Sequence, residues 1–178
     1  MKQMGGNEII HGGYADPSPY PEIKVLGENK LYAEILMDDY AGGVSEFTAI
    51  NQYLYHYFIS NKEAEEVANM WERISITEMH HMEMLAETIL LLGGNPIYRG
   101  SQNTNCCCWN AGYVYYGCNL CGRLHADLMS EYEAIRNYER HIKEINDPYV
   151  QAILARIILD EKVHIEHFNK AIGKYCGW

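Results

Sequence analysis

Apolar residues recur at helical spacing along most of the chain after residue 28. Because side chains three and four positions apart share one face of a helix, this spacing predicts helices with one apolar side each. Asp147-Pro148 is typical of a helix start, and Gly93-Gly94 is typical of a helix end. With these boundaries the pattern predicts four long helices, over residues 29–60, 62–93, 119–146 and 148–175.

The links between these segments predict how the helices are arranged. Short links join the first helix to the second and the third to the fourth, so each pair forms an antiparallel hairpin. Residues 95–118 form a long crossover between the two pairs. The expected fold class is therefore all-α, an antiparallel four-helix bundle with a long crossover between helices 2 and 3. Gly42-Gly43 interrupts the first helix and marks a bend or a close helix contact.

Residues 1–28 differ in character from the rest of the chain. Pro17, Pro19 and Pro21 fix the backbone angle φ and remove amide donors, so this stretch cannot form a regular helix or a central strand. We expect an irregular N-terminal extension over residues 1–28 and a helical bundle over residues 29–178.

Charge and composition narrow the function classes. The chain has 24 acidic and 14 basic residues, a formal net charge of −10, so a phosphate backbone would repel it and we expect no nucleic-acid partner. No apolar run approaches the roughly 20 residues that span a bilayer, and the first residues lack the apolar core of a signal peptide. We therefore expect no membrane partner and a cytoplasmic location, with the six cysteines reduced.

Two of the predicted helices carry the same pair of polar residues within an apolar stripe. Glu78-x-x-His81 lies in the second helix and Glu161-x-x-His164 in the fourth, and residues three apart aim at a common point. A single pair of this kind is usually solvated surface. Here both pairs share their faces with large apolar residues, so burial would be costly unless cations neutralised the carboxylates. The pattern therefore predicts a pair of divalent metal ions.

The other two helices are expected to add one inward carboxylate each. Glu46 is the acid on the apolar stripe of the first helix. On the third helix two acids compete, and the pattern favours Glu131, which shares a face with apolar residues, over Glu133, which shares a face with polar ones. A tyrosine follows each inward acid by seven residues, Tyr53 in the first helix and Tyr138 in the third, so the two hairpins are copies of one half-site.

Four glutamates and two histidines make an oxygen-rich shell that suits iron or manganese. The same ligand set is typical of di-iron and di-manganese carboxylate bundles. From the geometry we expect Glu78 and Glu161 to bridge the two metals. The other four residues would each bind one metal: Glu46, Glu131, His81 and His164.

Three predicted helices also resemble bacterioferritins in sequence. The resemblance is carried by EFTAINQYLYH at residues 46–56, by TEMHH at 77–81 with ILLLGGNP at 89–96, and by LDEKVHI at 159–165. A weaker match over residues 127–131 also favours Glu131. The resemblance covers roughly residues 30–172 apart from 95–118, and it implies the ferritin-like superfamily. It implies oxidation of iron(II) by dioxygen or hydrogen peroxide at a centre of two iron ions, with Tyr53 beside the centre.

Two departures from bacterioferritins change the expected assembly. Few residues follow the fourth helix, where cage-forming bacterioferritins have a fifth helix, so we expect a homodimer or another small homo-oligomer instead of a hollow shell. Met79 matches the position that binds haem between two bacterioferritin subunits, and it points away from the predicted centre. A methionine there more often packs than binds, so packing is favoured over a haem cofactor.

Cysteines gather in and just after the crossover. Cys118-x-x-Cys121 is half of a rubredoxin-type or zinc site, and Cys106, Cys107 and Cys108 could supply the rest. Three consecutive cysteines chelate poorly, so an adventitious or redox-buffering cluster is favoured over a metal site. Cys176, near the end of the chain, carries no signal.

These patterns and the resemblance together favour a di-iron oxidoreductase that oxidises iron(II) with dioxygen or hydrogen peroxide, a ferroxidase or peroxide-detoxifying enzyme of the oxidative-stress response. A manganese catalase is the nearest alternative, because its site uses similar ligands. A non-catalytic metal-binding or assembly module that uses the bundle only as a scaffold is the second alternative.

Overall fold

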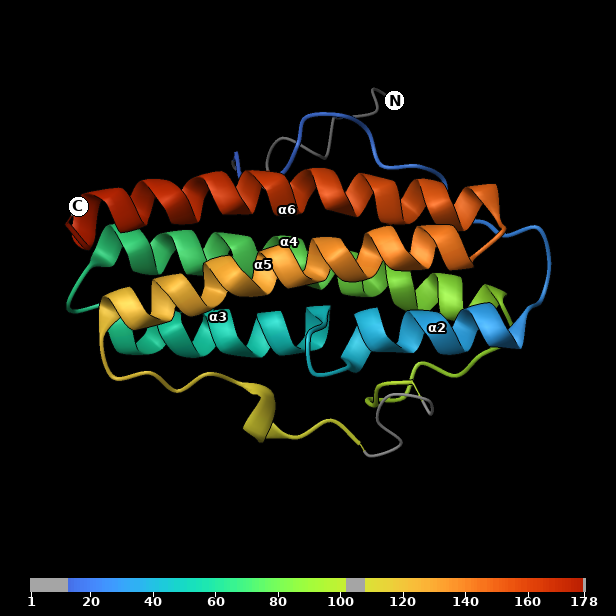
Figure 1. Ribbon diagram of the computed structural model, residues 1–178, viewed down its shortest axis with the longest axis horizontal. Helices are drawn as coiled ribbons and strands as arrows, with labels where there is room; N and C mark the ends of the chain where they lie inside the picture. The colour runs from blue at the N-terminus through green and yellow to red at the C-terminus, as the bar shows by residue number, and fades with distance from the viewer. Residues whose placement is uncertain (1–12, 102–107, 178) are drawn as a thin grey trace, which may run out of the picture.

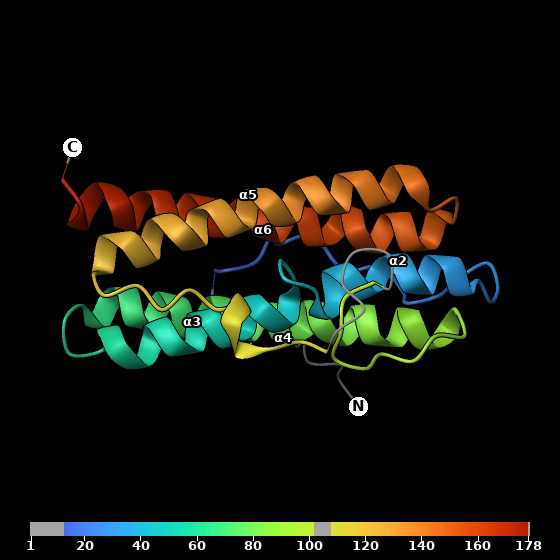
Figure 2. The ribbon, with the colours of Figure 1, turned by 60° about the horizontal axis from the view of Figure 1, so that its bottom comes forward.

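The computed structural model describes residues 13–101 and 108–177, and this part of the chain is almost entirely helical. Helix α3 pairs with α4, α5 pairs with α6, and α2 continues the line of α3 (Figures 1 and 2). The predicted all-α four-helix bundle with a long crossover is confirmed. The elements are α2 (Lys30–Ala41), α3 (Glu46–Ser60), α4 (Glu65–Leu91), the short 3-10 helix η1 (Ala111–Tyr113), α5 (Leu120–Glu144) and α6 (Pro148–Tyr175).

The first predicted helix is broken into α2 and α3 at the glycine pair. A Cβ atom on Gly42 would lie 2.6 Å from the carbonyl oxygen of Asp38, so a side chain there would force the backbone to shift. After the break, the side chain of Ser45 caps α3 by accepting a hydrogen bond from the amide of Thr48. The break makes Glu46 the first residue of α3, where the helix dipole favours a carboxylate.

The remaining helix ends follow the boundary residues found in the sequence. Helix α4 ends at Leu91, and Gly93 follows two residues later with a φ of 79°, in the left-handed region that a helix end of this type requires. Helix α6 begins at Pro148, and the side chain of Asp147 accepts hydrogen bonds from the amides of Tyr149 and Val150. These caps fix the lengths of the helices and therefore which residues face one another across the bundle.

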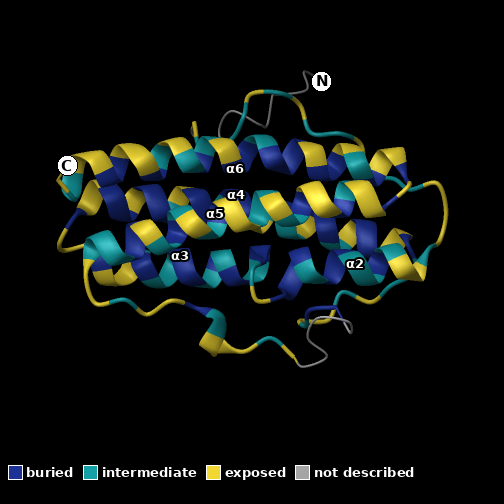
Figure 3. Cartoon of the chain, viewed as in Figure 1, coloured by how far each residue is buried: buried dark blue, intermediate teal, exposed yellow. Residues whose placement is uncertain are grey.

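The apolar core has two parts with a polar band between them. One part, with Leu36, Leu85 and Leu154, fills the end of the bundle near α2. The other part, with Trp71 and Phe168, fills the end near the start of α5. Buried positions on each helix face the neighbouring helices, and exposed positions repeat along the outer sides (Figure 3). The candidate site lies in the band between the two apolar parts.

Two irregular segments cover the bundle. Residues 13–28 run along α6 and pack Tyr20, Ile23 and Val25 against the core (Figure 1). The described parts of the crossover, residues 95–101 and 108–118, lie along α2 and α3, where the Trp109 ring packs 4.8 Å from the ring of Phe47. No helix in the two described stretches of chain is long and apolar enough to cross a membrane.

The cysteines differ from the expectation in one respect. Cys121, in the first turn of α5, forms a disulfide with Cys176, which follows α6. The expectation of reduced thiols is therefore wrong for this pair, and Cys121 is not available to a Cys-x-x-Cys metal site. The antiparallel pairing of α5 and α6 brings together two ends that are 55 residues apart in sequence. Cys108 and Cys118 are free and exposed, whereas Cys106 and Cys107 lie outside the described residues.

Candidate metal centre

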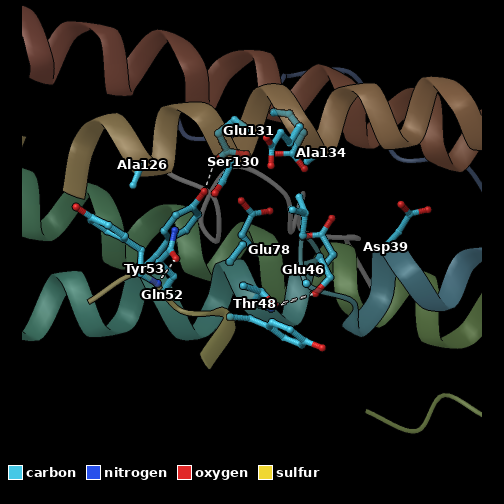
Figure 4. A pocket seen from close by; sticks show the side chains of 18 of the residues that line it. Asp39, Glu46, Thr48, Gln52, Tyr53, Glu78, Ala126, Ser130, Glu131 and Ala134 are labelled. Atoms are coloured by element: carbon cyan, nitrogen blue, oxygen red, sulfur yellow. Dashed lines mark hydrogen bonds between the residues drawn. The ribbon is translucent and has the colours of Figure 1, made fainter. Parts of the chain in front are cut away.

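The structure brings all six of the predicted glutamates and histidines together at the middle of the bundle. They come from four helices, and each side chain is buried. Glu46 begins α3, and Figure 4 shows it beside Glu78 and opposite Glu131. Glu133, the competing acid on α5, is half-exposed. The members of this group, called the carboxylate–histidine cluster below, are Glu46, Glu78, His81, Glu131, Glu161 and His164.

The first half of the cluster is arranged around the Nδ1 atom of His81. This atom lies 2.8 Å from Glu78 Oε2, 3.5 Å from Glu161 Oε1 and 3.6 Å from Glu46 Oε2. One potential ligand atom from each of these four residues lies within 4.8 Å of the others. The four atoms could therefore surround a single cation.

The second half repeats this arrangement around the Nδ1 atom of His164. The distances are 3.0 Å to Glu161 Oε2, 3.1 Å to Glu78 Oε1 and 3.6 Å to Glu131 Oε1. These four residues form a second group with ligand atoms within 4.8 Å of one another. Glu78 and Glu161 belong to both groups, which is the position of a carboxylate that bridges two ions.

Two buried tyrosines connect the halves of the cluster. The hydroxyl of Tyr53 donates a hydrogen bond of 2.6 Å to Glu131, and the hydroxyl of Tyr138 donates one to Glu46. Each tyrosine therefore orients the carboxylate that belongs to the opposite hairpin. Burial, together with the neighbouring carboxylates, raises the pKa of both phenols well above the usual value, which keeps the hydroxyls protonated as donors.

Burial strongly affects the two outer carboxylates of the cluster. Burial raises the pKa of Glu46 well above its usual value, and the negative charge of Glu78 is the second largest cause. Burial and then the charge of Glu161 do the same to the pKa of Glu131. In the metal-free protein these two groups therefore hold protons more tightly than exposed glutamates do.

The two histidines also hold protons tightly in the metal-free protein. Burial lowers the pKa of His81, but the charge of Glu46 and several hydrogen bonds outweigh it, so this pKa lies well above the usual value. The same balance, with Glu78 as the largest favourable charge, raises the pKa of His164. Burial raises the pKa of Glu161, but hydrogen bonds from both histidines hold it at about 2. In the metal-free protein, the protonated histidines thus balance part of the charge of the buried carboxylates.

These pKa directions predict that metal binding releases protons. A metal ligand must be deprotonated, and the raised pKa values of Glu46, Glu131, His81 and His164 mean that protons compete with the metal. Manganese(II) affinity is therefore expected to rise as the pH is raised from about 6 to about 8. Calorimetric titration at one pH, in two buffers of different ionisation enthalpy, would show a buffer-dependent heat. An affinity that does not change with pH, together with a buffer-independent heat, would contradict this expectation.

The cluster fits a pair of divalent cations in two further respects. Among the residues that the structure describes, Oε1 of Glu78 is a buried acceptor that takes part in no hydrogen bond of good geometry, although His164 Nδ1 lies 3.1 Å away. An oxygen left this way at the centre of the bundle is suited to a metal ion. Oxygen and imidazole donors without thiolate favour iron or manganese over copper(I) or structural zinc.

Two buried histidine–aspartate pairs flank the cluster. His56 Nδ1 lies 2.8 Å from Asp127, which also accepts a hydrogen bond of 2.6 Å from the Trp71 indole. His141 Nδ1 lies 2.6 Å from Asp39 at the other end. Both histidines are buried, and neither pairing was expected from the sequence patterns. The similarity of the two hairpins did contain a signal for these histidines: His56 stands ten residues after Glu46, and His141 stands ten residues after Glu131.

Met79 lies away from the cluster on the outer side of α4. Its side chain is 42% exposed, as expected for the residue that follows an inward-pointing Glu78. Among the other histidines, His125 is exposed, and His80 and His167 are partly exposed.

A cavity of about 220 Å³ reaches the cluster (Figure 4). Tyr113 and Tyr115 of the crossover line one side of it, and the crossover is held there by a hydrogen bond of 2.7 Å from the Tyr115 amide to Gln52. All of the charged side chains that the structure describes along this cavity are acidic: Asp39, Glu46, Glu78, Glu131, Glu133 and Glu161.

The fold and the cluster together define a class of protein, a four-helix bundle with a candidate dinuclear metal site. The chain belongs to the ferritin-like domain family, whose profile matches residues 44–175. A bacterioferritin from Mycobacterium leprae is 33% identical in an alignment of 133 residues that covers 72% of this chain and 77% of the relative. A probable manganese catalase from Clostridium acetobutylicum is 28% identical in an alignment of 174 residues that covers 86% of this chain and 75% of the relative.

Solved structures show the same fold. KatB, a manganese catalase from Anabaena PCC7120, matches with a TM-score of 0.79 at 24% identity, over 88% of this chain and 78% of that chain. A bacterioferritin from Rhodobacter capsulatus matches with a TM-score of 0.71 at 24% identity, over 85% of this chain and 89% of that chain. The similarities therefore include manganese catalases and bacterioferritins, and they do not choose between manganese and iron.

Proposed function

We propose that the chain is a dinuclear-metal oxidoreductase that oxidises iron(II) with dioxygen or hydrogen peroxide. The observation that carries this proposal is the acidic lining of the cavity that reaches the carboxylate–histidine cluster. Such a lining attracts cations and raises their local concentration. Four of the six acids are the ligands themselves, and Asp39 and Glu133 add to them, so the lining supports the entry of divalent cations such as iron(II).

In this proposal each chain holds two iron ions, with manganese as the alternative metal. Glu78 and Glu161 would each contact both ions, because each contributes to both ligand groups. The first ion would also be held by Glu46 and His81, and the second by Glu131 and His164. Four carboxylates balance the charge of two divalent ions, as a poorly solvated interior requires. The bound pair supplies one-electron oxidation and reduction at each ion.

The electrons and atoms of the proposed reaction balance in a simple way. Two iron(II) ions each give one electron to hydrogen peroxide, the oxygen–oxygen bond breaks, and two protons complete two molecules of water. With dioxygen, four iron(II) ions and four protons are needed. Tyr53 and Tyr138 hold the outer carboxylates in place through their hydrogen bonds, and the apolar parts of the core on both sides limit the access of water.

A manganese catalase is the second candidate. The similarity to the probable manganese catalase from Clostridium acetobutylicum, which covers 86% of this chain, favours it. A catalase uses one peroxide molecule as oxidant and another as reductant, so it requires no iron(II). A non-catalytic metal-binding or assembly module would bind metal with the same residues and turn nothing over.

Metal analysis combined with two activity measurements separates these three functions. We expect two metal ions per chain in protein purified from its native host, and repeated oxidation of added iron(II) under air or with peroxide. The rate of iron(II) oxidation under air and the rate with peroxide should both exceed those of a Glu78→Ala control. Manganese in the purified protein together with rapid oxygen release from peroxide would favour the catalase. Bound metal without turnover of iron(II) or peroxide would overturn the enzymatic proposal.

A further inference from the structure

The two E-x-x-H repeats differ at the residue that comes directly before the glutamate. Asp160 precedes Glu161, and Thr77 occupies the same place before Glu78. Helices α4 and α6 lie antiparallel. The residue before the glutamate on one helix therefore lies beside Nε2, the outer ring nitrogen, of the histidine on the other helix. Asp160 fulfils this arrangement, since its Oδ2 atom lies 2.9 Å from His81 Nε2. An outer partner of this kind fixes the orientation of a metal-binding imidazole and raises its strength as a donor.

The second histidine obtains its outer partner from outside the bundle helices. The side chain of Thr77 is shorter than that of an aspartate. The outer nitrogen of His164, Nε2, lies instead 2.9 Å from the backbone carbonyl oxygen of Tyr14. The hydroxyl of Thr77 also reaches this carbonyl, at 3.4 Å. Tyr14 belongs to the N-terminal segment that runs along α6. One imidazole is thus held by a charged carboxylate and the other by a neutral carbonyl.

The segment that carries Tyr14 is fastened to the same helix. Residues 13–20 are called the strap below. Arg156 donates hydrogen bonds to the carbonyls of Asp16 and Ser18, at 2.8 and 3.1 Å, and its guanidinium lies 3.9 Å from the centre of the Tyr20 ring. Asp160 accepts a hydrogen bond of 2.7 Å from the Asp16 amide and one of 2.6 Å from the Tyr20 hydroxyl. Asp160 therefore supports His81 and anchors the strap at once.

We propose that Asp160 and the Tyr14 carbonyl are positioning groups that make the two halves of the metal centre unequal. A hydrogen bond to a carboxylate polarises an imidazole more than one to a neutral carbonyl does, so the His81 half binds its metal first and more tightly. The His164 half fills second, and its affinity depends on the docked strap. By linkage, metal in the second half stabilises the docked strap by the same factor. This inference rests on the proposed dinuclear site, but it does not depend on the reaction catalysed there.

The test is a calorimetric titration of the metal-free full-length chain with manganese(II), on four proteins. The unsubstituted protein should bind two ions in two steps of unequal affinity. Asp160→Asn removes the charge beside His81 and should weaken the first step by about 10- to 100-fold. Thr77→Asp places a carboxylate beside His164 and should strengthen the second step until the two steps merge. Thr77→Val, the matched control, keeps the Tyr14 carbonyl and should leave two unequal steps.

Hydrogen exchange at the amides of Asp16 and Ser18 supplies a second readout. In the unsubstituted protein, exchange should slow when the second ion binds. In Thr77→Asp the new carboxylate would repel the Tyr14 carbonyl, so the strap should exchange faster while the second metal binds more tightly. A general loss of packing would weaken binding and speed exchange together. Faster strap exchange together with a higher affinity for the second ion therefore separates a positioning role from a structural one.

The possible outcomes separate this inference from the proposed function. Two equal and independent steps in the unsubstituted protein would overturn the inference and leave the dinuclear proposal intact. The inference also fails if Asp160→Asn weakens only the second step, or if strap exchange does not respond to metal. If Thr77→Asp does not fold, Asp160→Asn and the exchange of the unsubstituted protein still test the inference. Absence of paired binding in every protein would instead overturn the proposed function.

Discussion

Replacing Glu78 with alanine is expected to abolish the binding of a metal pair. Glu78 contributes to both ligand groups, and its two oxygens lie 2.8 Å from His81 Nδ1 and 3.1 Å from His164 Nδ1. Its removal takes one ligand from each ion and leaves three carboxylates to balance two divalent ions. We therefore expect the bound manganese or iron to fall from two ions per chain to one weakly bound ion or none, as measured by elemental analysis after gel filtration.

Glu133→Ala is the matched control for this experiment. Glu133 lies on α5 and lines the cavity, but it is half-exposed and belongs to neither ligand group. The Glu133→Ala protein should retain two ions per chain, and Glu161→Ala should behave like Glu78→Ala. Loss of the pair in Glu133→Ala and its retention in Glu131→Ala would show that the wrong acid of α5 has been assigned to the site.

Replacing Trp71 with alanine is expected to cause the largest loss of stability among single substitutions in the core. Trp71 is fully buried, and its indole donates a hydrogen bond of 2.6 Å to Asp127. The substitution leaves a large cavity beside His56 and removes one donor from a buried carboxylate. The free energy of unfolding should fall by roughly 3–5 kcal/mol, as measured by urea denaturation of the metal-free protein.

Two further variants determine what the Trp71 measurement means. Tyr132→Ala removes an aromatic ring from the exposed side of α5, and it should change the free energy of unfolding by no more than about 0.5 kcal/mol. Trp71→Phe keeps most of the ring volume but loses the indole donor, so its effect should be intermediate. A loss below about 1 kcal/mol for Trp71→Ala would mean that this end of the core is not packed as described.

The helices could be predicted from sequence because their signals are local. Apolar spacing, the Asp147-Pro148 start and the Gly93 end act within a few residues, and the structure places helix boundaries close to those expected. The burial of Glu131 could also be predicted, because the apolar stripe of α5 continues on both sides of it. Its competitor Glu133 lies on the polar face, where the structure leaves it half-exposed.

The features that could not be predicted depend on contacts between distant parts of the chain. The His56–Asp127 pair joins residues that are 71 positions apart, and the His141–Asp39 pair joins residues that are 102 positions apart. A polar residue on a helix gives no local sign of whether a distant charge will meet it. The contact of His164 with Tyr14 could not be predicted either. The irregular extension has no periodicity from which its path along the bundle could be inferred.

The central claim is that six buried side chains hold two metal ions side by side in the middle of the bundle. A crystal structure of the manganese-loaded protein, with anomalous difference maps recorded at the manganese edge, tests it most directly. We predict two peaks per chain, roughly 3.5–4 Å apart, between Glu78 and Glu161. A single peak, peaks elsewhere, or a structure with Glu46, Glu131 or either histidine turned outward to solvent would contradict the claim.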